Sequence, residues 1–115
     1  MLPWLIGAAV VAFAVVAFWD EIVSWLRDFI PKVKAAFREF KRNVLHAAAM
    51  FVQQVGAAAA DIKHKVFYKE NNQWMEQTTT RQIDKSELPP SIKRKLGFAE
   101  EEITEEMENE LQMAI

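Results

Sequence analysis

Apolar residues are concentrated at the start of the chain, where the run from Leu2 to Trp19 holds 18 residues and no charge. As a helix rising about 1.5 Å per residue, this run spans about 27 Å, close to the roughly 30 Å hydrocarbon core of a bilayer. Trp4 and Trp19 lie near its ends and Trp25 follows, as is typical of aromatic residues at membrane interfaces. The pattern predicts a transmembrane helix over residues 1–19. It disfavours a cleaved signal peptide and a buried core helix.

Basic residues follow this apolar run, and none precedes it. Because Lys and Arg near a span collect on the cytoplasmic side, the predicted location is a membrane, most simply a bacterial inner membrane. The N-terminus is then outside and the C-terminus cytoplasmic. The same residues form a basic face that either attracts anionic lipid or is simply solvated. They are Arg27, Lys32, Lys34, Arg38, Lys41 and Arg42.

Helical spacing continues through residues 20–65. Ile22, Leu26 and Phe29 belong to one apolar stripe, and Pro31 predicts a kink or the start of a new helix. Beyond the proline, apolar residues recur in steps of three and four, as in a coiled-coil seam. The positions expected to pack between helices of a homo-oligomer are Ala8, Ala12, Val33, Phe37, Phe40, Val44, Ala48, Phe51, Val52, Gly56 and Ala60.

Residues 44–60 are uncharged and rich in alanine. Small residues at every fourth position from Ala48 to Ala60 would let two helices approach closely. Alanine is also the best helix former, so an ordinary helix outside the membrane is the simpler interpretation. The polar Gln53 and Gln54 disfavour a second membrane span, and they are the candidates for the lining of an assembled pore.

The spacing of apolar residues is no longer helical at residues 66–83, where alternating strand-forming residues predict a β-hairpin. Asn71 and Asn72 can supply the positive φ that a two-residue turn requires. This turn pairs Tyr68 with Met75 and Lys69 with Trp74. Because an isolated hairpin is marginal in water, it needs a partner. Its expected contact residues are Trp74, Thr78 and Thr80.

Residues 84–115 predict a short helix that begins at Pro89 and Pro90, followed by an acidic amphipathic helix with Thr104 as its N-cap. The last 16 residues hold seven acids and no base. We expect this helix to dock on the basic helix or to bind a partner. Its apolar contact residues are Ile103, Met107 and Leu111.

Composition excludes several kinds of chemistry. The 115 residues include no cysteine and only three glycines, which leaves no thiolate site and no glycine-rich phosphate loop. His46 and His64 would lie too far apart on one helix to share a metal, and His64, between two lysines, is expected at the surface. We therefore expect no metal, no cofactor and no enzymatic activity. Nucleic-acid binding is less favoured than lipid binding.

The sequence thus predicts a mainly α membrane protein. Its parts are a transmembrane helix (1–19), a kinked amphipathic and alanine-rich helical region (20–65), a β-hairpin (66–83) and a short helix plus an acidic helix (84–115). Two functions stay open. The first is a homo-oligomeric pore-forming or membrane-perturbing effector, for example in bacterial defence. The second is a membrane anchor whose hairpin and acidic helix recruit a soluble partner. The first is favoured because the hairpin and the seam otherwise lack partners.

Overall fold

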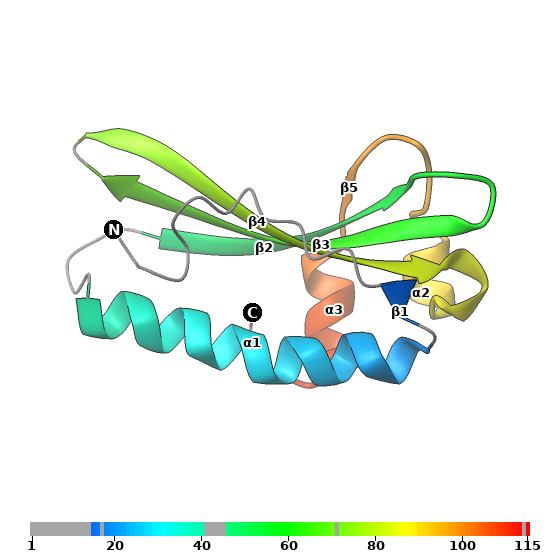
Figure 1. Cartoon of the computed structure of the whole chain (residues 1–115), viewed down its shortest axis with the longest axis horizontal. Helices are drawn as coiled ribbons and strands as arrows, with labels where there is room; N and C mark the ends of the chain where they lie inside the picture. The colour runs from blue at the N-terminus through cyan, green and yellow to red at the C-terminus, as the bar shows by residue number, and fades with distance from the viewer. Residues whose placement is uncertain (1–14, 17, 41–45, 71, 114) are drawn as a thin grey trace.

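The computed structural model describes residues 15–16, 18–40, 46–70, 72–113 and 115 of the chain. One long helix lies along one face of a twisted sheet (Figure 1). In chain order the elements are β1 (Val15–Val16), α1 (Trp19–Phe40), β2 (His46–Gln54), β3 (Ala59–Glu70), β4 (Gln73–Asp84), the 3₁₀ turn η1 (Lys85–Glu87), α2 (Pro90–Lys93), β5 (Glu101–Glu102) and α3 (Thr104–Leu111).

The sheet is built on three long strands, β2, β3 and β4, of which neighbours are antiparallel. Two short strands extend its edges. β1 runs parallel to β4, and β5 runs antiparallel to β2, which gives the order β1-β4-β3-β2-β5. β2 begins at His46, opposite Tyr68 of β3. Within the described part of the chain, the β3–β4 hairpin therefore continues beyond β2 as a two-stranded arm, visible at the upper left of Figure 1.

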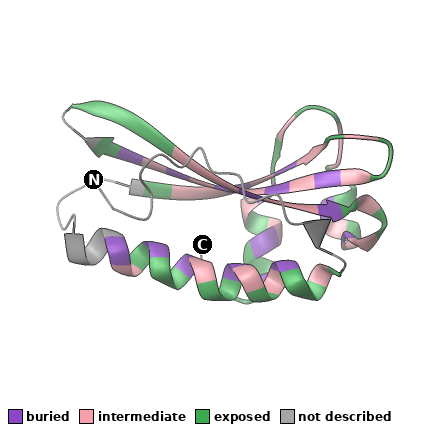
Figure 2. Cartoon of the chain, in the orientation of Figure 1, coloured by how far each residue is buried: buried purple, intermediate pink, exposed green. Residues whose placement is uncertain are grey.

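Side chains along β3 alternate between a buried inner face, toward α1, and a more exposed outer face (Figure 2). The inner positions are Ala60, Ile62, His64, Val66 and Tyr68. Successive residues of a strand point to opposite faces, and residues paired across strands share a face. The inner face of the sheet is therefore fixed by the pairing register.

Helix α1 covers the inner face with an apolar stripe formed by Ile22, Leu26, Ile30 and Val33, all buried. Their spacing of three and four residues places them on one side of a helix. Asp20 and Glu21 occupy the first turn, where negative charge is favourable. Pro31 lies inside α1 and is exposed, and the helix continues through it as one element.

Helix α3 and its leading residue attach to β2. The backbone N–H of Ile103 donates to the carbonyl of Met50 (2.8 Å), and the N–H of Met50 donates to the hydroxyl of Thr104 (3.0 Å). Met107 and Leu111 then enter the main core. This confirms that the acidic helix docks, but Thr104 is not its N-cap, because Ile103 holds that position without a side-chain bond.

Several local predictions are confirmed. Tyr68 pairs with Met75 and Lys69 with Trp74, and Asn72 has φ of 62°. The short helix begins with Pro90 at its first turn and buries Ile92. These features depend on short-range turn chemistry and spacing, which a sequence carries directly.

The predicted fold class is wrong, because the chain forms a small α+β structure with a long antiparallel sheet. Helical structure after the predicted Pro31 kink reaches only Phe40, and β2 and β3 occupy residues that we assigned to the alanine-rich helix. Alanine accepts either backbone state, so pairing with the strongly alternating β3 and packing of Met50 and Val52 on the core decide the outcome.

The predictions of a transmembrane helix, of a transmembrane class of protein and of a single-pass membrane location are wrong. Among the described residues, no helix is both long enough and apolar enough to span a bilayer. Val15 and Val16 form a strand with β4, and α1 starts afresh at Trp19, so the apolar run does not reach Trp19 as one helix. Hydropathy alone does not separate a span from apolar residues that enter a sheet. Trp4, Ala8 and Ala12 lie outside the described residues.

Candidate functional site

Polar side chains interrupt the centre of the inner sheet face. His64 lies on β3, and Gln77, Thr79 and Arg81 occupy the corresponding side of β4, because they pair with Val66, His64 and Ile62. A buried polar group normally has a hydrogen-bond partner, and each exception needs an explanation. On this face, His64, Gln77 and Arg81 have buried polar atoms without a hydrogen-bond partner.

His64 is the most deeply buried of these groups, with 1% of its surface exposed. Neither Nδ1 nor Nε2 has a hydrogen-bond partner. The ring of Phe29 on α1 meets the imidazole edge to face, with 5.4 Å between ring centroids. Met50 on β2 and Thr79 on β4 are its cross-strand neighbours.

Burial lowers the pKa of His64 from about 6.5 to about 4, and the positive charge of Lys34 on α1 acts in the same direction. Both causes disfavour the imidazolium form. At neutral pH the ring is therefore uncharged. It carries one N–H donor and one nitrogen acceptor, both without partners.

A pocket of about 120 Å³ adjoins His64. Helix α1, strands β2 and β3 and the last residue, Ile115, form its wall. Apart from His64 and Lys34, the described residues that line it have aliphatic side chains. An engineered apolar cavity of about 150 Å³ holds one benzene, so this pocket has room for a group of about five non-hydrogen atoms.

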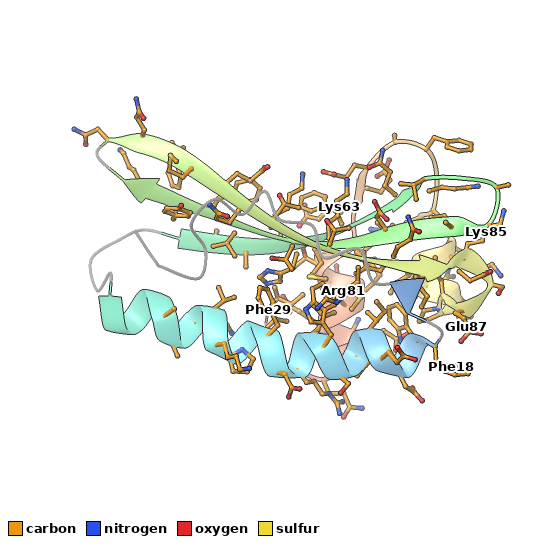
Figure 3. The ribbon with its side chains drawn as sticks, in the orientation of Figure 1. Phe18, Phe29, Lys63, Arg81, Lys85 and Glu87 are labelled. Atoms are coloured by element: carbon orange, nitrogen blue, oxygen red, sulfur yellow. The ribbon has the colours of Figure 1, made fainter. Side chains whose placement is uncertain are left out.

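Arg81 lies next along the inner face, where Figure 3 places it, with Phe29, between α1 and the sheet. Its guanidinium stacks over Trp25, 4.8 Å from the ring centroid, and Trp25 stacks on Phe29 at 5.9 Å. The buried Nη1 of Arg81 and the buried Oε1 of Gln77 have no partners. A chain of aromatic contacts therefore connects Arg81 to His64.

The outer face carries a different cluster. Glu100 forms ion pairs with Lys63 (3.0 Å) and Lys65 (2.6 Å), and Lys65 also lies 4.8 Å from the centroid of the Phe51 ring. Burial would raise the pKa of Glu100, but hydrogen bonds from the two lysines outweigh it and lower that pKa. Every charged group of this cluster has a partner, which indicates that the cluster has a structural role in attaching the Glu100 segment to β3.

The two residues predicted to line a pore lie beside this cluster, and Gln53 contacts its Lys63. Gln53 donates to the carbonyl of Phe98 (3.0 Å) and accepts from Lys63 (2.7 Å). The backbone N–H of Gln54 donates to the carbonyl of Gly97 (2.7 Å), and its side chain donates to the carbonyl of Gly56. Within this chain both glutamines hold a loop against the sheet.

The hairpin arm exposes apolar surface. Trp74 is 63% exposed and Met75 is 37% exposed, and both lie near the tip of the arm. Of the other two predicted contact residues, Thr78 is half-buried and Thr80 is buried.

The predicted membrane-facing residues are distributed along α1. Trp19 and Trp25 are half-buried and pack against the core. Arg27, Lys32 and Lys34 are exposed, and Arg27 donates to the carbonyl of Leu111 (3.3 Å). Arg38 lies in α1, in a part whose side chains are not described, and Lys41 and Arg42 lie outside the described residues.

The predicted intersubunit positions are also dispersed. Val33, Val52 and Ala60 are buried in the cores of this chain, and so are Ile103, Met107 and Leu111. A partner could reach the last three only if α3 left the sheet. Ala48 lines the pocket, Phe51 lies in the outer cluster, and Gly56 occupies the β2–β3 connection. Phe37 and Phe40 belong to α1 without described side chains, and Val44 lies outside the described residues.

Sequence reasoning missed the burial of His64, because it placed this residue on the surface of a helix. The alternation of Ala60, Ile62, His64, Val66 and Tyr68 carries the signal, since it puts the histidine on the apolar side of a strand. His46 lies on β2, opposite Tyr68, so the two histidines occupy neighbouring strands and not one helix.

The comparisons with known proteins leave the function open. No protein family matches the chain, and neither a curated protein nor a solved structure is significantly similar to it. Within the described residues, no group of three or more His, Cys, Asp or Glu side chains is arranged to hold a metal ion. Function is therefore inferred from the pocket and the arm.

Proposed function

We propose that the protein is a small-molecule-binding module and that its ligand enters the pocket beside His64. The observation that carries this proposal is the imidazole, which is buried against the pocket with both nitrogens unpartnered. An unpaired buried polar group costs about 1–3 kcal/mol, so a ligand that pairs with it gains affinity. An apolar pocket with a few polar groups is the usual form of a ligand site.

The lining favours binding over catalysis. A nucleophile–base pair or an acid–base pair requires two reactive groups within hydrogen-bond reach of each other. Among the residues that line this pocket, His64 is accompanied only by aliphatic side chains and Lys34. We therefore retain the prediction that the protein is not an enzyme.

Nuclear magnetic resonance titration of the full chain tests this proposal. The probes are three molecules with the same branched apolar body: 3-methylbutanoate, 3-methylbutanamide and 3-methylbutan-1-ol. We expect at least one of them to bind with a Kd of about 1 mM or tighter and to shift the His64 ring and Val66 signals. The absence of binding by all three would overturn the proposal.

Two leucine variants of β2 locate the binding. Ala48 lines the pocket, whereas the adjacent Ala49 points to the opposite face of the sheet. Ala48→Leu should fill the pocket and abolish binding, and Ala49→Leu is the matched control. Binding that survives Ala48→Leu would lie elsewhere and would contradict the proposal.

Self-association through the hairpin arm is a second candidate function, favoured by the exposure of Trp74. In the described part of the chain, β4 has a strand partner on its outer edge only at Gln82 and Ile83. An unpaired edge can accept a strand from a second copy, and the tryptophan would then be covered. Soluble-partner recruitment by the same arm is the competing outcome.

Light scattering with two matched variants tests self-association. We expect an oligomer that Trp74→Ser dissociates and that Phe98→Ser, a change at a similarly exposed aromatic away from the arm, leaves intact. A monomer at all concentrations would exclude self-association and leave recruitment of another protein. Binding of α1 to anionic lipid stays a separate prediction, which co-sedimentation with anionic vesicles tests.

A further inference from the structure

The outer edge of β4 is long and regular. From Gln73 to Arg81 the strand pairs with β3 residue by residue and without a bulge. In the described part of the chain, a strand lies along its other side only beyond this stretch, at Gln82 and Ile83. Natural edge strands commonly carry lysine, proline or a bulge that prevents pairing with another chain. Residues 73–81 have none of these three features.

The pairing register decides which backbone groups of β4 point to this edge. Met50 of β2 lies opposite His64 of β3. The N–H of Met50 donates to the hydroxyl of Thr104 and its C=O accepts from Ile103, so both groups point away from β3. The N–H and C=O of His64 therefore point to its other neighbour, Thr79 of β4. Because hydrogen-bonded and non-hydrogen-bonded pairs alternate along an antiparallel ladder, the odd-numbered residues of β4 bond to β3.

The even-numbered residues of β4 direct their N–H and C=O groups to the outer edge. Among them, Gln82 lies beside β1. The others lie in the stretch without a described strand partner on that side, and they are Trp74, Glu76, Thr78 and Thr80. These four positions are symmetric about Gln77. The same strand of a second copy, running antiparallel, pairs with all four when Gln77 lies on the two-fold axis.

Neighbouring registers are less favourable. A two-fold axis at Glu76 places this carboxylate opposite its own copy, and like charges directly opposite each other destabilise a pair of strands. An axis at Thr78 or beyond brings the second copy against the part of β4 that β1 occupies, and it leaves Trp74 unpaired. The axis at Gln77 places Trp74 opposite the second copy's Thr80. No like charges are then opposed, because Glu76 lies opposite Thr78.

The side chain at this centre carries an acceptor without a partner. The Oε1 of Gln77 is buried and accepts no hydrogen bond within the described part of the chain, although buried polar atoms normally have a partner. The residue as a whole is half-buried, so its amide can turn toward the edge. On the axis, Gln77 forms a non-hydrogen-bonded pair with its copy, in which the two Cα atoms are about 4.5 Å apart. The Nε2 of each glutamine can then donate to the Oε1 of the other.

We propose that two copies of the chain join edge to edge through β4, antiparallel and with Gln77 on the two-fold axis. This inference rests on the second candidate function, self-association through the hairpin arm, and specifies its geometry. The two sheets become one continuous sheet, and the outward backbone groups of all four even-numbered residues are bonded. Residues paired across strands share a face, so the two α1 helices cover the same side of the joined sheet.

Single-cysteine variants of the full chain test the register, because the natural sequence contains no cysteine. Under mild oxidation Gln77→Cys should form an intermolecular disulfide at least about tenfold faster than Glu76→Cys, Thr78→Cys or Thr79→Cys. Only on the axis do two equivalent Cα atoms approach within disulfide range, whereas one residue away they are already about 8 Å apart. Fastest cross-linking at another position, or equally slow cross-linking at all four, would overturn the proposed pairing.

Two substitutions at Thr78 test the backbone bonds, with dimerisation measured by light scattering. Thr78→Pro removes an N–H that points outward and not to β3, so the circular dichroism of the monomer should be unchanged. The Kd of the dimer should rise at least about tenfold, because each copy loses a bond to the other. Thr78→Val keeps the N–H and should dimerise like the parent chain.

The outcomes separate this geometry from self-association in general. A dimer that survives Thr78→Pro with an unchanged Kd would overturn edge pairing through β4, while self-association through another surface would stand. A parent chain that is monomeric at all concentrations would exclude self-association itself, and the proposed pairing with it.

Discussion

Mild acid should destabilise this protein through one buried side chain. The pKa of His64 is lowered from about 6.5 to about 4 in the folded chain, by burial and by Lys34. Between these two values the unfolded chain binds a proton that the folded chain does not. The contribution of His64 to stability is therefore complete above pH 6.5, and it falls by about 1.4 kcal/mol per pH unit as the pH decreases from 6.5 to 4. Between pH 7.5 and pH 5 the expected loss is about 2 kcal/mol.

Urea unfolding followed by far-ultraviolet circular dichroism at these two pH values measures the effect. The pKa of Glu100 is lowered by its lysines, so the stability that its charge contributes is present above the ordinary value of about 4.5 and is lost only below it; its titration therefore adds little above pH 5. His64→Phe should abolish most of the difference, because a phenyl ring can keep the contact with Phe29 and does not titrate. His46→Gln controls for the other histidine. The reasoning is refuted if His64→Phe loses as much stability as the parent chain between pH 7.5 and pH 5.

Three substitutions test the packing, each by urea unfolding at pH 7.5. Pro31→Ala should raise the free energy of unfolding by about 2 kcal/mol, because it restores the backbone N–H donor that proline lacks inside α1; no gain would show that the helix is already adapted to the proline. Met107→Ala should lower it by about 2–4 kcal/mol, since the side chain is fully buried between α3 and the sheet. Gly56→Leu should change it by less than about 0.5 kcal/mol, because a Cβ added at that position would meet no atom within 4 Å. Loss of an oligomer on Gly56→Leu would instead support the close packing expected from the sequence.

Local features of this fold can be predicted from the sequence because short-range rules decide them. The pairing of Glu70 with Gln73 sets the hairpin register, and Asn72 adopts the expected positive φ. Proline at the first turn positions α2, and the four-residue spacing of Ile103, Met107 and Leu111 identifies the buried side of α3. In each case residues close together in the sequence are sufficient to predict the local structure.

Short-range rules could not decide whether residues 46–65 form a helix or strands. The stretch reads as a helix by propensity, because it is rich in alanine, and by spacing, because apolar residues recur every three or four positions. Its strand structure depends on pairing with residues as far away as Asp84, which a local window does not include. When β3 is paired on both sides, its alternation of apolar and polar side chains fits a sheet. The alanines of β2 then adopt strand structure because they pair with β3.

His64 shows where the helical and the strand interpretations of the sequence differ most in their consequences. In a helix, flanking lysines make it a surface residue, whereas in a strand the same lysines point outward to Glu100 and the histidine points inward. An inner position flanked by Ile62 and Val66 favours an apolar side chain, and the imidazole there lacks every hydrogen bond it could make. Natural sequences tend to break their local rules where function requires it. The violation at His64 is therefore the strongest reason to look for a ligand in this pocket and not at the fully paired lysine cluster on the other face.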